Sequence, residues 1–180
     1  KSAVVVFGAA RARNVGRAWR LGSIAILERD QYRYLGVMVC ANLAWSVHFD
    51  ERLAVASGKL GSLIGLKLVG KSSSLALATL AFSSLVLSSL ESFFALCPLV
   101  SRGNGAILKR LEQFLARACR SLLWVHGNTN TDGVTAACGF LPVRARWAIK
   151  ALHLFGHVWR LHQSRLPRRV LAGSLRDSLA

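Results

Sequence analysis

The sequence predicts an α+β fold, in which a small β-sheet comes first and helices follow. Two observations lead to this prediction. Short apolar and β-branched runs, separated by glycines and polar turns, fill residues 1–41, as is typical of strands. Beyond Asn42 the apolar residues recur every three or four positions, which is the period of amphipathic helices. The chain has 180 residues and is 53% hydrophobic, which is enough to bury a core.

These patterns divide the chain into four segments. Residues 1–41 carry the strand patterns. Residues 42–101 and residues 102–165 carry two sets of helical patterns, and residues 166–180 form a short basic tail.

Three strands are expected in the first segment. Residues 3–7 are a continuous apolar run with three valines, which predicts a buried strand. A second strand is expected over residues 23–27 and a third over residues 32–39. The third begins with aromatic residues and contains Gly36, which leaves room for a close approach to the backbone. We expect the three to pair as a small antiparallel sheet or as the edge of a larger one.

A helix is expected to begin after Asn42. Trp45, His48 and Arg52 are spaced by three and four residues, so they fall on one helical face. Three glycines later in this helix weaken it by about 1 kcal/mol each relative to alanine. Close packing, or a break near Gly70, would account for them.

The run from Ser72 to Leu90 is uncharged and allows two interpretations. Its 19 residues are long enough to cross a membrane. Eight of the 19 are Ser or Thr, however, and neither Trp nor Tyr flanks the run. We therefore favour a buried helix inside a helical bundle, which Pro98 would terminate.

The later helices have clearer boundaries. Residues 106–124 have the most regular apolar stripe, which predicts an amphipathic helix. The polar loop at 128–133 offers capping side chains to a short helix ending at Gly139. Pro142 is a suitable residue to open a last long helix over residues 143–163.

Positive charge dominates the composition and predicts a polyanionic partner. The formal net charge is +16, which favours nucleic acid first and an anionic membrane surface second. Two predicted helices each carry a basic face, and ordinary solvated faces mix the two signs. The faces comprise Lys109, Gln113, Arg117 and Arg120 on one helix, and Arg146, Lys150, His153, His157 and Arg160 on the other. Cations on rigid helices suit contact with the phosphate backbone.

Acid–base and metal chemistry find little support within the chain. Only eight Asp and Glu residues are present. Glu28 and Asp30 fall in a predicted turn, and Asp50 and Glu51 fall early in a helix, where they complement its dipole. A two-metal catalytic site is therefore not predicted here.

The histidines and cysteines do not predict a metal site either. His153 and His157 have helical i, i+4 spacing, but the glutamate of a zinc-protease helix is absent between them. The cysteines are too far apart in sequence for a metal knuckle or a redox pair. We interpret them as buried thiols of a protein in a reducing compartment: Cys40, Cys97, Cys119 and Cys138.

Several motifs, in order, resemble the end of the reverse transcriptase of non-LTR (LINE-type) retrotransposons. Residues 1–7, Lys-Ser-Ala-Val-Val-Val-Phe, resemble the strand that follows the catalytic Asp-Asp hairpin of that family. Residues 32–37, Tyr-Arg-Tyr-Leu-Gly-Val, resemble its Tyr-Lys-Tyr-Leu-Gly-Val, the hairpin next to the primer-grip region. Trp45, His48 and Arg52 match the Trp-x-x-His-x-x-x-Arg pattern that opens its thumb.

Weaker similarities continue towards residue 162. They include Leu111-Glu112, the Arg-Ser-Leu-Leu-Trp of residues 120–124, and residues 131–146. The sequence departs from the family at residues 93–98 and at Trp124, which replaces a common glycine, and Cys138 replaces a leucine. The catalytic Tyr-x-Asp-Asp motif and the fingers would lie before Lys1, so we expect the chain to come from the middle of a longer reading frame.

The resemblance implies roles for the four segments. Residues 1–41 would be a palm remnant with a primer-grip-like hairpin, residues 42–101 thumb helices, residues 102–165 a helical connector, and residues 166–180 a basic tail. Lys1 would donate a proton to the leaving pyrophosphate, although a solvated strand end is an equal alternative. The primer terminus would be placed by Tyr34, Leu35, Gly36 and Val37. The template–primer backbone would be held by Arg52, Lys59, Arg117, Arg120, Arg146, Lys150 and Arg160.

The resemblance also implies cofactors and partners. Mg²⁺ is implied for the parent polymerase, and no cofactor or metal is expected in this chain. The expected partners are an RNA/DNA template–primer duplex and the upstream fingers and palm of the same polypeptide, with no membrane and an intracellular location in the nucleus or the cytoplasm. Apolar surface should be exposed where that palm docks. The alternatives are a stand-alone basic nucleic-acid-binding helical module from a decayed element, and a membrane protein spanning residues 72–90.

Overall fold

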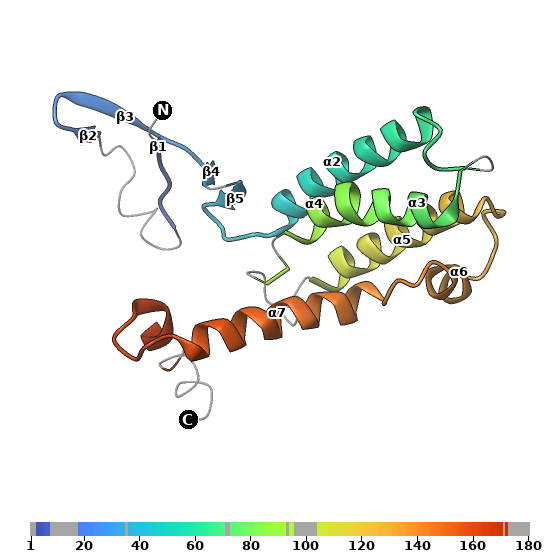
Figure 1. Ribbon diagram of the computed structural model, residues 1–180. Coiled ribbons are helices and arrows are strands. Elements are labelled where there is room, and N and C mark those ends of the chain that lie inside the picture. Colours follow the sequence, from blue (N-terminus) through green and yellow to red (C-terminus); the bar gives the residue numbers. More distant parts are fainter. Residues whose placement is uncertain are drawn as a thin grey trace.

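Strands come first in the chain and helices follow, so the prediction of an α+β fold is confirmed (Figure 1). The computed structural model describes residues 3–7, 18–34, 36–70, 73–92, 94–95, 104–170 and 172. The strands β1 to β3 extend away from the helices, and the β4–β5 hairpin lies between the two parts (Figure 1).

The first sheet is mixed rather than antiparallel. β1 (Ala3–Val4) pairs in parallel with β3 (Ile24–Glu28), and β2 (Trp19–Leu21) pairs antiparallel with β3. The predicted strand over residues 3–7 is therefore only two residues long. The predicted second strand corresponds to β3, which begins one residue later than expected. It pairs with β2 because Gly22 adopts φ +61° and turns the chain back between the two strands.

The expectation of a single strand over residues 32–39 is wrong. β4 (Gln31–Tyr34) and β5 (Val37–Cys40) form an antiparallel hairpin, in which Tyr34 is the register partner of Val37. Gly36 has φ +82° in the turn, a conformation that glycine adopts at little cost. The apolar pattern alone does not reveal this reversal, whereas the resemblance of residues 32–37 to a family hairpin does imply one.

The helices form a bundle below and beside the hairpin (Figure 1). α2 packs against the helical segment α3–η1–α4 and against α5, and α5 packs against α6 and α7. The bounds are α2 (Ser46–Gly65), α3 (Leu75–Ala81), the π-helical turn η1 (Phe82–Leu87), α4 (Ser88–Glu91), α5 (Asn104–Leu123), α6 (Thr131–Ala137) and α7 (Val143–Arg160).

One face of the serine-rich run packs into this bundle, whereas the opposite face is exposed at Leu77, Leu80 and Leu85, so the run is only half-buried and not enclosed as predicted. Its inner face is fully or almost fully buried at Ala78, Phe82, Val86 and Leu90. Five of its described hydroxyl groups bond back to carbonyls of the preceding turn, as in the bond of 2.8 Å from Ser84 Oγ to the Leu80 oxygen, so these five need no outside partner. Across the residues that the structure describes, no helix combines the length and the apolar character needed to cross a membrane.

Aromatic rings connect the ends of the bundle. Trp147 of α7 is fully buried and stacks on Phe94, with ring centroids 5.0 Å apart. Its ring also contacts Phe49 of α2 at 5.2 Å. These three rings join segments nearly 100 residues apart in sequence within one continuous core.

Local capping sets the boundaries of the last helices. The Asn130 side chain accepts a hydrogen bond of 3.0 Å from the Gly133 N–H, which caps α6. Gly139 has φ +73° just after α6, and Pro142 stands at the N-cap of α7. The predicted caps and the start of α7 are confirmed, although α7 ends at Arg160 rather than at residue 163.

Three of the four cysteines are buried free thiols, as predicted. Cys40, Cys119 and Cys138 are all buried, whereas Cys97 lies outside the described residues. The Cys138 thiol donates to the Cys119 carbonyl oxygen at 3.9 Å. Burial raises the pKa of both the Cys119 and the Cys138 thiols, so these two side chains act as small apolar core residues.

Removing the Trp147 ring from the aromatic stack should cause a large loss of stability. Trp147→Ala should lower the free energy of unfolding by about 3–5 kcal/mol, because it empties the space between α2 and α7. Urea denaturation followed by circular dichroism measures this loss. Leu152→Ala on the same helix is the control: its side chain is 66% exposed, so its effect should stay within about 0.5 kcal/mol. Equal losses in the two variants would contradict the assigned core.

Candidate nucleic-acid interface

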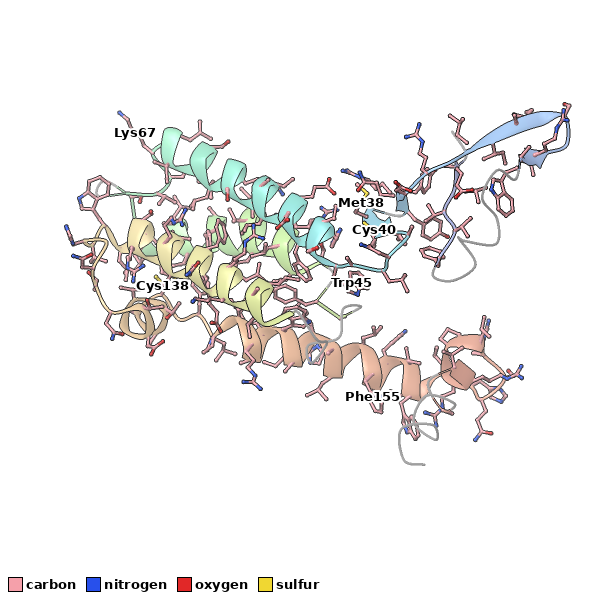
Figure 2. All side chains as sticks on the ribbon, turned by 180° about the vertical axis from the view of Figure 1, so that it is seen from behind. Met38, Cys40, Trp45, Lys67, Cys138 and Phe155 are labelled. Atoms are coloured by element: carbon pink, nitrogen blue, oxygen red, sulfur yellow. The ribbon has the colours of Figure 1, made fainter. Side chains whose placement is uncertain are left out.

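The β4–β5 hairpin is tied to the first turns of α2 by side chains of that helix. His48 Nδ1 accepts a hydrogen bond of 3.1 Å from the Met38 N–H. The Arg52 guanidinium donates to the Gly36 carbonyl oxygen. Figure 2 shows Met38, Cys40 and Trp45 gathered where the hairpin meets the start of α2. The hairpin and α2 therefore form one junction.

Ion pairing and ring contacts reinforce the junction. Arg33 of β4 forms a salt bridge with Glu51 of α2. The fully buried His48 ring meets the Trp45 ring edge-on, with centroids 6.4 Å apart. Backbone hydrogen bonding extends the hairpin by one further step, because the Ala41 N–H donates to the Asp30 oxygen at 2.8 Å.

His48 is neutral in this junction. Burial, helped by the positive charges of Arg52 and Arg33, lowers its pKa from 6.5 to about 4. A backbone N–H can only donate, so the Nδ1 atom that faces Met38 must be unprotonated. Protonation of His48 would break this hydrogen bond and bury a charge beside two arginines.

The proposed primer-positioning residues lie at the tip of the hairpin. The Tyr34 side chain is 64% exposed, and Gly36 and Val37 follow it across the turn. The Gly36 oxygen is occupied by Arg52. Leu35 and Lys1, the proposed proton donor, lie outside the described residues.

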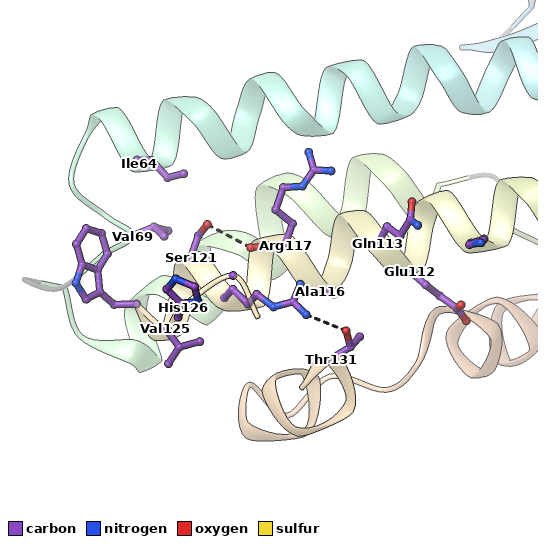
Figure 3. A pocket seen from close by; sticks show the side chains of 14 residues that line it. Ile64, Val69, Glu112, Gln113, Ala116, Arg117, Ser121, Val125, His126 and Thr131 are labelled. Atoms are coloured by element: carbon purple, nitrogen blue, oxygen red, sulfur yellow. Dashed lines mark hydrogen bonds between the residues drawn. The ribbon is translucent and has the colours of Figure 1, made fainter. Parts of the chain in front are cut away.

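An open groove of about 1200 Å³ lies between the end of α2 and α5 (Figure 3). Its apolar side includes Ile64 and Val69, and its polar side comes from α5 and the loop after it. Figure 3 shows Arg117 extending from α5 on the side facing α2. The described lining residues are Ile64, Val69, Lys109, Glu112, Gln113, Ala116, Arg117, Arg120, Ser121, Trp124, Val125, His126, Gly127 and Thr131.

The two arginines predicted on this helix have different roles in the groove. Arg120 donates to the Thr129 oxygen at 2.8 Å and to Thr131 Oγ1 at 2.9 Å, so it holds the loop that leads into α6. The exposed Arg117 guanidinium makes no hydrogen bond or ion pair with another described residue. Lys109 adds a second exposed cation, and Glu112 is the acidic side chain of the described lining.

Other predicted phosphate contacts turn out to be engaged within the fold. Lys59 Nζ donates to the Leu85 oxygen at 3.0 Å. Arg146 pairs with the buried Glu91 and lies over the Phe140 ring at 5.8 Å. With Arg52 and Arg120, these side chains act as structural ties. Arg117, Lys150 and Arg160 are instead exposed, the last two on α7.

Sequence reasoning did not include Trp124 among the candidate binding residues. It had noted only that a tryptophan replaces a common glycine. The side chain is 65% exposed at the end of the groove, and its backbone has φ +55°. An exposed aromatic residue next to an arginine-rich helix was the available signal.

The state of His48 predicts a pH-dependent stability. Its folded-state pKa of about 4 lies below its ordinary value of 6.5, so its contribution is complete above pH 6.5 and is lost as the pH falls towards 4. The loss should reach about 3 kcal/mol. His48→Asn keeps an acceptor for the Met38 N–H but does not titrate, so it is the matched control.

Urea titrations at pH 7 and pH 5 measure the difference. Carboxylates titrate equally in both proteins, so wild type should lose more stability between these pH values than His48→Asn. An identical loss in the two proteins would show that His48 does not control the junction.

Comparison with known proteins adds no relative from which the site could be interpreted. No protein-family model, curated protein or solved structure matches the chain. Within the described part of the chain, no group of three or more His, Cys, Asp or Glu side chains is placed to hold a metal ion. The interpretation of the groove and the junction therefore depends on their own geometry and on the motifs quoted above.

Proposed function

We propose that this chain is the C-terminal, non-catalytic portion of an RNA-directed DNA polymerase of the non-LTR retrotransposon type, and that it grips the template–primer duplex. One observation supports this most. The two segments that carry the resemblance meet in space, because His48 and Arg52 of the Trp-x-x-His-x-x-x-Arg pattern bond to the backbone at Met38 and Gly36.

This junction has the form that a primer-positioning element requires. A primer terminus must stay in register with the duplex behind it, so the element that places it has to move with the helices that hold the duplex. Two hydrogen bonds and the Arg33–Glu51 salt bridge fix the hairpin to α2. The exposed Tyr34 at the hairpin tip would then contact the primer end.

The exposed cations suit the phosphate backbone of a template–primer. Arg117, Lys150 and Arg160 extend from two long helices into solvent. Contact with phosphates requires spaced positive charge and no reading of bases, and the net charge of +16 adds long-range attraction. Arg52, Lys59, Arg120 and Arg146 would contribute indirectly, by holding the binding surfaces in place.

The chemistry of nucleotide addition belongs elsewhere in the parent polypeptide. Asp50, Glu51 and Glu91 each form a salt bridge with an arginine, so these carboxylates do not fit a pair of Mg²⁺ ions. The catalytic aspartates and the Mg²⁺ would lie in the upstream palm. Exposed apolar side chains on the first sheet suit docking of that palm: Leu21, Ile24 and Leu27, each more than 60% exposed.

A stand-alone basic nucleic-acid-binding module from a decayed element remains the second candidate. The same exposed cations would serve it equally well. The two candidates differ in what precedes Lys1 in the reading frame.

The coding sequence therefore provides the first test. Sequencing the region before the Lys1 codon should reveal an open frame that encodes a Tyr-x-Asp-Asp motif. Its absence from an otherwise open frame, or a stop codon directly upstream, would rule out the polymerase parent and leave the stand-alone module.

The second test is duplex binding. The chain should bind an RNA–DNA hybrid duplex with an affinity that falls steeply as salt is added, because binding releases counterions. Arg160→Gln, on α7, should weaken binding several-fold and reduce the slope of log affinity against log salt by about 1. Fluorescence anisotropy over a salt series measures both quantities.

Arg20→Gln is the matched control for this measurement. It removes the same charge from an exposed arginine on β2, which lies away from the helices (Figure 1). Its slope should equal that of wild type. A wild-type affinity that does not change with salt, or equal slopes for both variants, would contradict the assignment.

A further inference from the structure

Trp124 occupies a position where helices usually place glycine. It directly follows α5, and the Val125 N–H donates to the Arg120 oxygen at 3.1 Å as the helix ends. Its φ of +55° is left-handed, and a side chain makes that conformation unfavourable. Backbone strain of this kind is found often at ligand-binding sites.

The Trp124 ring lies against the backbone at Gly70 but remains open to solvent. It lies beside Gly70, where an added Cβ atom would be 3.6 Å from Trp124 Cζ3. Gly70 itself has φ +132°, a backbone conformation that residues with a side chain rarely adopt. The side chain is nevertheless 65% exposed, which is unusual for an aromatic residue of this size.

The surroundings of the ring select the chemistry of its occupant. Trp124 lines the same groove as Lys109 and Arg117, and both cations are exposed. A groove that combines an aromatic face with cations is the arrangement that binds unpaired nucleotides, by base stacking and phosphate contact. The internal base pairs of a duplex cannot offer a face to the ring, because they are already stacked on each other on both sides.

We propose that the α2–α5 groove binds single-stranded nucleic acid, with one base stacked on Trp124 and phosphates further along the strand at Arg117 and then Lys109. This rests on the proposed function, because it assigns the groove to the unpaired part of the same template–primer substrate. The duplex would contact the exposed cations of α7, Lys150 and Arg160.

The test exploits the strain at Trp124. Trp124→Gly removes the aromatic ring and relaxes the backbone, so it should raise the midpoint of thermal unfolding while weakening single-strand binding about tenfold. Trp124→Phe keeps a ring and should lose much less affinity. Fluorescence anisotropy with a labelled, unstructured RNA of about 12 nucleotides measures binding.

Two further measurements separate stacking from general charge attraction. Addition of the RNA should quench tryptophan emission in wild type and should do so much less in Trp124→Phe. Polyglutamate of matched charge should not displace the RNA. Displacement by polyglutamate would show an acidic polypeptide site and would overturn the proposal.

The outcomes distinguish this proposal from the proposed function. Unchanged single-strand affinity in Trp124→Gly, with salt-dependent duplex binding intact, would overturn the groove assignment alone. A wild-type chain that binds neither the single strand nor the hybrid duplex would overturn both. Equal weakening of single-strand and duplex binding by Trp124→Gly would also overturn the assignment of the groove to unpaired nucleotides.

Discussion

The stack of Trp147 on Phe94 and Phe49 is the contact on which the rest of the structure depends. It joins the last long helix to the first, so the helices of residues 42–101 and those of residues 102–165 share one core. Arg146, which directly precedes Trp147 in the sequence, forms a salt bridge with the buried Glu91. An isolated buried carboxylate would be costly, so packing and pairing have to form together.

The junction between hairpin and helix shows a second constraint, which is the exclusion of charge from a buried ring. His48 holds the Met38 backbone only while it is neutral, and the nearby Arg33 and Arg52 favour that state. The same two arginines carry their own ties, to Glu51 and to the Gly36 oxygen. The positive charges of Arg33 and Arg52 therefore act mainly within the fold.

The cationic side chains consequently fall into two groups with different roles. Some cations bind the chain itself, as Arg120 does with the loop before α6. Others, such as Arg117, extend into solvent and leave their charge for a polyanion. Trp124 fits the second group, because its strained backbone and exposed ring contribute little to the stability of the fold.

The positions of the helices after residue 42 were predictable from the sequence, because the amphipathic period, the Asn130 cap and the start of a helix at Pro142 are local signals. It also indicated the burial of the cysteines. The parallel pairing of β1 with β3, and which arginines remain exposed, could be learned only from the folded structure. These features depend on partners far away in the chain, and neither strand register nor the partner of an arginine is encoded in its immediate neighbours.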